Sequence, residues 1–124
     1  MELSRELPGA NRSVRWCRAD AITVDDRELQ RSFLLTPAEV VADWGPGTVG
    51  ELTDAALDQV LALEPELVLL GTGSRQQFPP AAVMARFLTR GIGIEVMDNA
   101  GAARTFNLLA GEGRRVVAAF LLPG

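Results

Sequence analysis

Polar residues follow two apolar segments of the 124-residue chain, at points where a binding site could form. The apolar run Leu67-Val68-Leu69-Leu70 leads directly into Gly71-Thr72-Gly73-Ser74. Glycines after a buried strand let backbone N–H groups approach an anion, as in phosphate-binding loops. The third glycine of a dinucleotide fingerprint and the lysine of a P-loop are both missing. The pattern therefore favours a tight exit turn, in which Thr72 or Ser74 bonds to the backbone, over a phosphate loop.

A second polar group follows the apolar residues 92–97. Since parallel strands end at one edge of a sheet, Asp98 and Asn99 are expected beside Thr72. Arg104, Thr105 and Asn107 are expected on the first turns of a helix over about 102–110, and the N-terminus of a helix favours anions. Helix capping by Asp98 or Asn99, and pairing of an arginine with a carboxylate, are the alternatives. The candidate site for an anionic small molecule or a protein partner comprises Gly71, Thr72, Gly73, Ser74, Asp98, Asn99, Arg104, Thr105 and Asn107.

The composition excludes most catalytic machinery. The chain has no His, no Tyr and a single cysteine, Cys17, and all of its 12 basic residues are arginine. Without His there is no Ser-His-Asp or Cys-His catalysis and no His-ligated metal, and without Lys there is no Schiff base. We therefore predict no catalytic residue, no metal site and no cofactor. An acid/base carboxylate such as Asp98, with an arginine clamp, remains chemically possible as a weak activity.

Charge and hydropathy limit the partners and the compartment. The net charge of −4 argues against nucleic-acid binding. No apolar run approaches the roughly 18 residues that a membrane span requires. The first twelve residues carry Glu2 and Glu6 and no apolar core, which argues against a signal peptide and a mitochondrial presequence. The sequence predicts a cytoplasmic protein without a membrane span.

The expected elements form an α/β domain over residues 14–124, preceded by a loose leader at 1–13. An alternating segment at 14–18, a strand at 21–24, a turn at 25–27 and a strand at 28–35 predict an N-terminal β-hairpin. Helices are then expected after Thr53, after Pro79-Pro80 and over 102–110, alternating with apolar strands. The second helix has an apolar stripe of Val83, Met84, Phe87 and Leu88. Short strand–helix–strand connections imply a largely parallel sheet with flanking helices.

Four sequence blocks resemble, in order and spacing, a small α/β family of unknown function. The blocks are residues 67–74, 91–98, 104–109 and 112–116. The family includes the mitochondrial complex I (NADH:ubiquinone oxidoreductase) assembly factor three and the adipogenesis-associated domain proteins. The resemblance implies a three-layer single domain with a mixed, mostly parallel central sheet, in which one strand is antiparallel to the rest. It implies no established activity, and relatives often carry Cys and Tyr where this chain has Ala103 and Phe106.

Composition and resemblance together predict a non-catalytic binding or assembly module. Its expected role is to hold a protein partner during the biogenesis of a respiratory or membrane complex. The alternative is an anion- or small-molecule-binding domain with a strand-end pocket and weak enzyme activity. A structural homodimer is a third possibility. Trp16 and Trp44 are expected to pack in the core, or to mark an interface if they are exposed.

Overall fold

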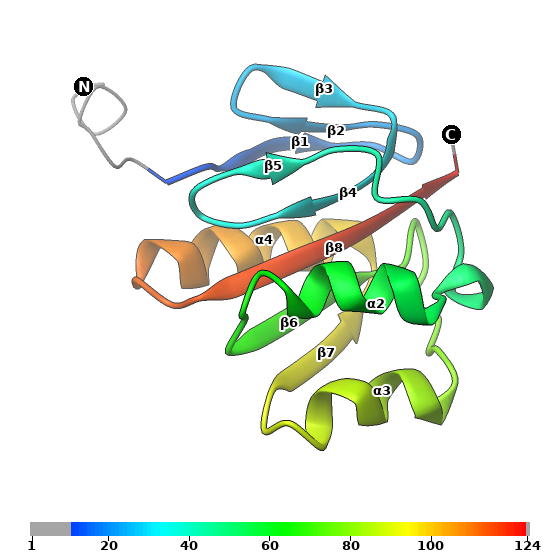
Figure 1. Cartoon of the computed structure of the whole chain (residues 1–124). Helices are drawn as coiled ribbons and strands as arrows, with labels where there is room; N and C mark the ends of the chain where they lie inside the picture. The colour runs from blue at the N-terminus through cyan, green and yellow to red at the C-terminus, as the bar shows by residue number, and fades with distance from the viewer. Residues whose placement is uncertain (1–10, 124) are drawn as a thin grey trace.

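The computed structural model describes residues 11–123 of the chain. Within that range the polypeptide forms eight strands, three α-helices and one short 3₁₀ turn, arranged as shown in Figure 1. In chain order they are β1 (Val14–Cys17), β2 (Ile22–Val24), β3 (Arg27–Leu29), β4 (Arg31–Leu35), β5 (Val40–Val41), η1 (Val49–Glu51), α2 (Asp54–Leu61), β6 (Leu67–Gly71), α3 (Ala81–Leu88), β7 (Gly93–Met97), α4 (Asn99–Gly111) and β8 (Val116–Pro123).

The central sheet is mixed, as the resemblance implies. Its five strands lie in the order β5-β4-β8-β6-β7. Strand β6 pairs in parallel with both β7 and β8, whereas β4 is antiparallel to both of its neighbours, β8 and β5. Strand β4 is therefore the one strand of this sheet that runs against the others.

Helices cover both faces of the sheet, which gives the predicted three layers (Figure 1). The chain moves from β6 to β7 through α3, and then crosses back over β6 to reach β8 through α4. Crossovers of one hand that travel in opposite directions place their helices on opposite faces. Strand β8 is buried on both faces from Val116 to Leu122, which explains its uninterrupted apolar sequence.

The N-terminal strands form a second, antiparallel sheet in the order β1-β2-β3, packed on the α4 side of the molecule. The prediction of one continuous strand over 28–35 is wrong. The chain leaves the small sheet at Gln30, because β3 buries only Leu29 on one face, whereas β4 buries four consecutive residues between two layers. A strand that is buried on one face and a strand that is buried on both belong in different sheets.

Two helix starts differ in how well the sequence indicates them. Thr53 caps α2 as predicted, since its hydroxyl accepts a hydrogen bond from the Ala56 N–H at 3.2 Å. Helix α4 was predicted to begin near residue 102 but begins at Asn99, with Asp98 as its N-cap. Gly101 lies in the first turn although glycine is a poor helix former. A Cβ at this position would stand 3.0 Å from an Asp98 carboxylate oxygen, so the position favours a residue without a side chain.

The predicted leader at 1–13 lies only partly within the described range, and residues 1–10 fall outside it. The amide of Asn11 donates to the Ala110 carbonyl at 2.7 Å. The backbone N–H of Arg12 donates to the Pro37 carbonyl at 2.9 Å. Residues 11 and 12 are therefore attached to the end of α4 and to the β4–β5 turn.

Candidate functional site

The carboxyl ends of β6 and β7 meet the start of α4, as the sequence predicts for parallel neighbours. The Thr72 N–H donates to the Met97 carbonyl at 3.0 Å, and the Asn99 N–H donates to the Gly73 carbonyl at 2.8 Å. Six of the candidate residues therefore lie on or directly beside these three element ends: Gly71, Thr72, Gly73, Ser74, Asp98 and Asn99.

Asn99 bridges the ends of two adjacent parallel strands. Its amide oxygen accepts from the Gly73 N–H at 3.1 Å, just beyond β6, and its amide nitrogen donates to the Leu121 carbonyl of β8 at 3.0 Å. The side chain is 3% exposed. The chain reverses its direction of travel across the sheet at β7, and open α/β sheets bind ligands at the carboxyl ends of strands beside such a reversal. In this chain an asparagine side chain fills that position.

Thr72 has its polar atoms engaged within the protein. Its hydroxyl donates to the Arg75 carbonyl at 2.7 Å, lies 3.2 Å from the Met97 carbonyl, and accepts from the Gln77 N–H at 3.0 Å. The residue is buried. Thr72 thus closes the loop after β6, as the exit-turn interpretation predicts. Gly73 completes the turn with a φ of +100°, a backbone conformation that glycine tolerates best.

Asp98 occupies the anion position at the start of α4. Its carboxylate accepts from the Gly101 N–H at 2.7 Å. The positive end of a helix dipole attracts a negative charge, and here the chain supplies that charge itself. A second anion at the same N–H groups would be repelled by the carboxylate.

Three candidate residues lie farther along α4 than predicted, because the helix starts earlier. Asn107 is eight residues beyond Asn99, or about 12 Å at the usual helical rise. Its side chain accepts from the Val14 N–H at 2.9 Å and donates to the Val14 carbonyl at 3.0 Å. It therefore binds the edge of β1 and lies away from the strand ends. Thr105 directs its hydroxyl toward the Met97 sulfur at 3.6 Å, and Arg104 is exposed.

A small cavity of about 150 Å³ lies between the β1–β2 turn and the strand ends. It is lined by Cys17, Arg18, Ala19, Gly73, Ser74, Asp98, Asn99 and Ala100. Burial raises the pKa of the Cys17 thiol above its ordinary value of 9.0, the Asp98 carboxylate raises it further, and the Arg104 guanidinium opposes them. The thiol is therefore protonated at neutral pH, and a protonated thiol is a poor nucleophile.

Sequence reasoning missed Cys17 and Arg18 as neighbours of the strand ends. The alternation in β1 indicates a strand but does not indicate that its end reaches α4. Among residues 11–123 no cluster of three or more His, Cys, Asp or Glu side chains is placed to hold a metal ion. No described helix has the length and apolar character needed to cross a membrane.

Large apolar side chains are exposed in several places. Trp16 is 69% exposed, Phe78 68% and Leu88 56%, and Leu108 is exposed on α4. The prediction that Leu88 completes the buried stripe of α3 is wrong, because the helix ends there and turns its last residue toward solvent. Trp44 is buried, and its indole N–H donates to the Ala56 carbonyl at 3.0 Å.

This architecture defines a compact three-layer α/β domain in which Asn99 and Thr72 bind the strand ends to one another. The protein family described as "Protein of unknown function (DUF498/DUF598)" matches residues 14–121, and the chain belongs to that family. A curated relative from Danio rerio, NADH dehydrogenase (ubiquinone) 1 alpha subcomplex assembly factor 3, is 37% identical over 92 residues. The match covers 73% of this chain and 51% of the relative, so the chain spans about half the length of that protein.

Solved structures from two bacteria share the fold. An NMR structure of a Xanthomonas campestris protein is 50% identical, with a TM-score of 0.84 over 91% of this chain and 86% of that one. A crystal structure of a Bordetella parapertussis protein is 35% identical, with a TM-score of 0.83 over 91% of this chain and 97% of that one. The chain is therefore similar over nearly its whole described length to domains of its own size.

Proposed function

We propose that this chain is a non-catalytic assembly module that holds a protein partner during the biogenesis of a respiratory or membrane complex. The observation that carries the proposal is the 37% identity, over 73% of this chain, to a protein named as an assembly factor. The geometry of the strand ends agrees with a role in binding a partner rather than in catalysing a reaction. Asn99 and Thr72 use their side-chain polar atoms in hydrogen bonds inside the fold, and one carboxylate oxygen of Asp98 accepts from the Gly101 N–H.

Gentle affinity purification of the tagged chain from its native host tests this proposal. The expected result is co-purification of subunits of one membrane-bound complex, in a stoichiometric and salt-sensitive association. A host that lacks the chain should accumulate less of the same complex, measured on native gels. Recovery of the chain alone under gentle conditions, together with normal levels of every membrane complex in the deletion strain, would refute the proposal.

Three finer expectations from the sequence stay predictions, each with its own measurement. Anion binding at the strand ends is tested by thermal-shift screening with anionic metabolites, comparing the parent chain with Arg104→Ala. The homodimer is tested by sedimentation at several concentrations. The cytoplasmic location is tested by fractionation of host cells.

A further inference from the structure

Strand β7 is the open edge of the central sheet. It has one hydrogen-bonded neighbour, β6, in the part of the chain that the structure describes. At five residues it is longer than β5, the two-residue strand at the opposite edge. An edge strand presents a row of unpaired N–H and C=O groups to whatever lies beside it.

The parallel register identifies which groups face outward. The Gly93 N–H donates to the Glu66 carbonyl, and the Met97 carbonyl accepts from the Thr72 N–H. Alternate residues of a strand direct their backbone groups to opposite sides, so positions 93, 95 and 97 bond to β6. Ile94 and Val96 therefore direct their N–H and C=O groups to the free edge. Of these four groups only the Val96 carbonyl has a partner among residues 11–123, the side-chain amide of Gln76 at 2.8 Å.

The other edges of the described fold are short or sealed. In the small sheet, β3 has three residues, and the side chain of Asn107 binds both backbone groups of Val14 on β1. An amide side chain placed in this way reproduces the hydrogen bonds of a neighbouring strand. The Gln76 amide does the same on β7 for a single carbonyl and leaves the other three outward groups without a partner among residues 11–123, on a half-buried Ile94 and a Val96 that is 7% exposed.

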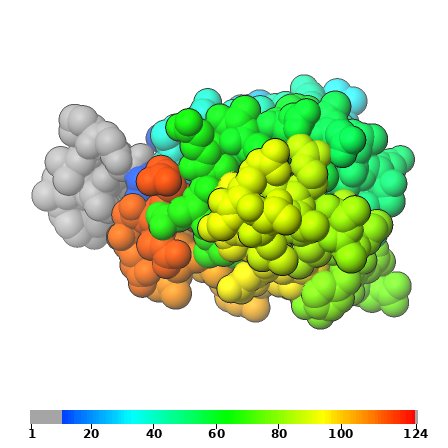
Figure 2. Space-filling view, turned by 60° about the horizontal axis from the view of Figure 1, so that its bottom comes forward, coloured from blue at the N-terminus to red at the C-terminus, as the bar shows by residue number. Residues whose placement is uncertain are grey.

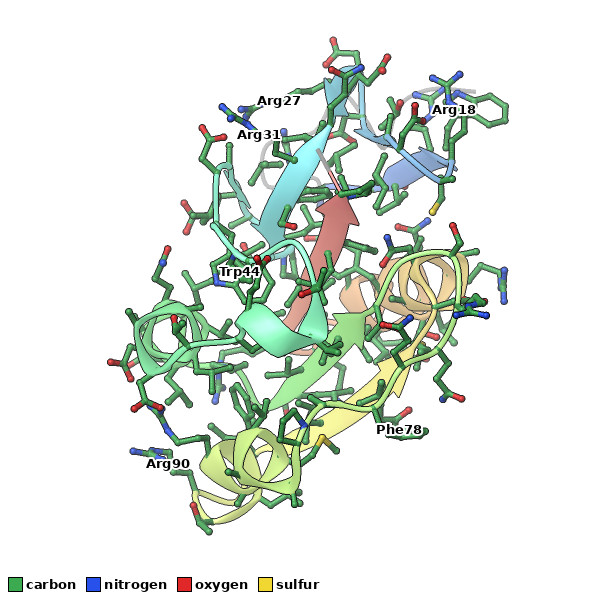
Figure 3. The ribbon with its side chains drawn as sticks, turned by 90° about the vertical axis from the view of Figure 1, so that its right-hand side faces the viewer. Arg18, Arg27, Arg31, Trp44, Phe78 and Arg90 are labelled. Atoms are coloured by element: carbon green, nitrogen blue, oxygen red, sulfur yellow. The ribbon has the colours of Figure 1, made fainter. Side chains whose placement is uncertain are left out.

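The side chains around this edge are those of a contact surface. Phe78, two residues beyond Gln76, is 68% exposed and projects beside β7 (Figure 3). Figure 2 shows β7 and α3 together on one face of the molecule, with α4 beside them. Glu95 is exposed, and no arginine forms an ion pair with it among the described residues. An unpaired carboxylate on an edge strand favours a basic residue in the opposing position.

We infer that β7 is the docking edge for the protein partner, which adds one extended segment to the central sheet and places a lysine or arginine opposite Glu95. This inference rests on the proposed function, because it gives the location at which that partner binds. The spacing of the outward backbone groups of Ile94 and Val96 matches the groups of an added polypeptide strand. A second copy in the register that places Glu95 against its own equivalent would oppose two carboxylates, which is unfavourable.

A titration with a defined probe tests the edge independently of the partner. The probe is a capped pentapeptide, acetyl-Thr-Val-Lys-Val-Thr-amide, added to the ¹⁵N-labelled chain and followed by amide shifts in NMR spectra. We expect saturable shifts at Ile94 and Val96, and weaker binding when glutamate replaces the lysine of the probe. The expected ratio is roughly fivefold, which corresponds to a cross-strand charge pair of about 1 kcal/mol.

Three variants sharpen the result. Ile94→Pro removes an outward N–H without removing a bond to β6 and should abolish the shifts at Val96. Glu95→Lys changes an exposed side chain only and should reverse the preference between the two probes, which keeps the test valid if the proline variant does not fold. Leu108→Ala removes an exposed apolar side chain from α4 and should bind like the parent chain.

Each contrary outcome has a specific meaning. Absence of saturable shifts at Ile94 and Val96 with either probe overturns the inference, as does an unchanged probe preference in Glu95→Lys. Shifts of the same two amides with protein concentration alone would assign the edge to a second copy and also overturn it. If purification from the host recovers a partner while the edge fails these tests, the proposed function stands and only its location is wrong. If the edge binds the probe but no partner is recovered, the proposed function fails.

Discussion

Replacement of Asn99 by alanine should destabilise the chain far more than its size suggests. The substitution leaves the Gly73 N–H and the Leu121 carbonyl without their partners, at a residue that is 3% exposed. Each unpaired buried group lowers the free energy of unfolding by about 1–3 kcal/mol, and the better helix propensity of alanine offsets roughly 0.5 kcal/mol of that loss. We expect a loss of about 1.5–5.5 kcal/mol in the free energy of unfolding. For a chain of this size the corresponding drop in Tm is roughly 10 °C.

Urea unfolding followed by tryptophan fluorescence measures this loss, because Trp44 is buried and reports on the core. Asn107→Ala is the matched control, since it removes the same side chain from the same helix. Asn107 is exposed and its two partners lie on the edge strand β1, so water can replace its bonds, and we expect a loss of about 1 kcal/mol. Equal losses of unfolding free energy in the two variants, or a loss below about 0.5 kcal/mol for Asn99→Ala, would refute the conclusion that the Asn99 side chain holds the strand ends together.

Three further predictions follow from the contacts. Gly71→Ala places a Cβ 2.3 Å from the Asn99 amide oxygen and should cost about 2 kcal/mol or more in the same urea assay. Cys17 should react with iodoacetamide at pH 8 much more slowly in the folded chain than in urea, and Asp98→Asn should lower its pKa and speed the reaction. Because the folded pKa is the higher one, the contribution of Cys17 to stability is complete below pH 9.0 and is lost as the pH rises through the folded pKa. Arg86→Ala breaks ion pairs to two aspartates of α2 and should cost roughly 0.5–1 kcal/mol, less in 1 M NaCl.

Each of these has a control or a contrary result. A Cβ at Gly111 would meet nothing within 4 Å, so Gly111→Ala should be neutral or stabilising by about 0.5 kcal/mol. A similar loss at Gly71 and Gly111 would contradict the crowding argument. Equal alkylation of Cys17 before and after unfolding would contradict its burial. An Arg86→Ala loss that is unchanged by salt would show that the arginine acts through packing.

The central strands of the fold could be predicted from the sequence. Leu67 to Leu70 are continuously apolar because β6 is covered on both faces, and strands of this kind lie in the middle of parallel sheets. Thr53 is a helix cap that depends only on residues within one turn of it. The meeting of Thr72 with residues 98 and 99 follows from parallel pairing alone. Features that depend on local spacing, or on one face of one element, could therefore be predicted.

Features that depend on a distant partner could not. Asn99 looks like a ligand-binding residue because it follows a strand and opens a helix, but its role is decided by the Leu121 carbonyl, 22 residues away. The break at Gln30 depends on which sheet each half of the segment joins, and the polar residues Gln30, Arg31 and Ser32 do not show where one strand ends and the next begins. The open edge at β7 follows from the strand order, which no local pattern contains. Polar residues at strand ends are ambiguous until the atoms that they bind are known.

The resemblance to the family also concerns residues of α4 whose role depends on what they contact. It places a cysteine and a tyrosine of relatives at Ala103 and Phe106, and both of these side chains are buried between α4 and the sheet. A side chain on that inward face contacts the core, where cysteine behaves as a small apolar residue and a tyrosine hydroxyl requires a buried partner. Variation there changes packing and leaves the surface unaltered. Asn99 binds the ends of β6 and β8 to each other, and a cavity of about 150 Å³ remains beside it, between the β1–β2 turn and the strand ends. Among the described residues, Ile94 and Val96 on the edge of β7 have outward backbone groups without a partner, which is why the partner is inferred to bind at this edge and not on the outward side of α4.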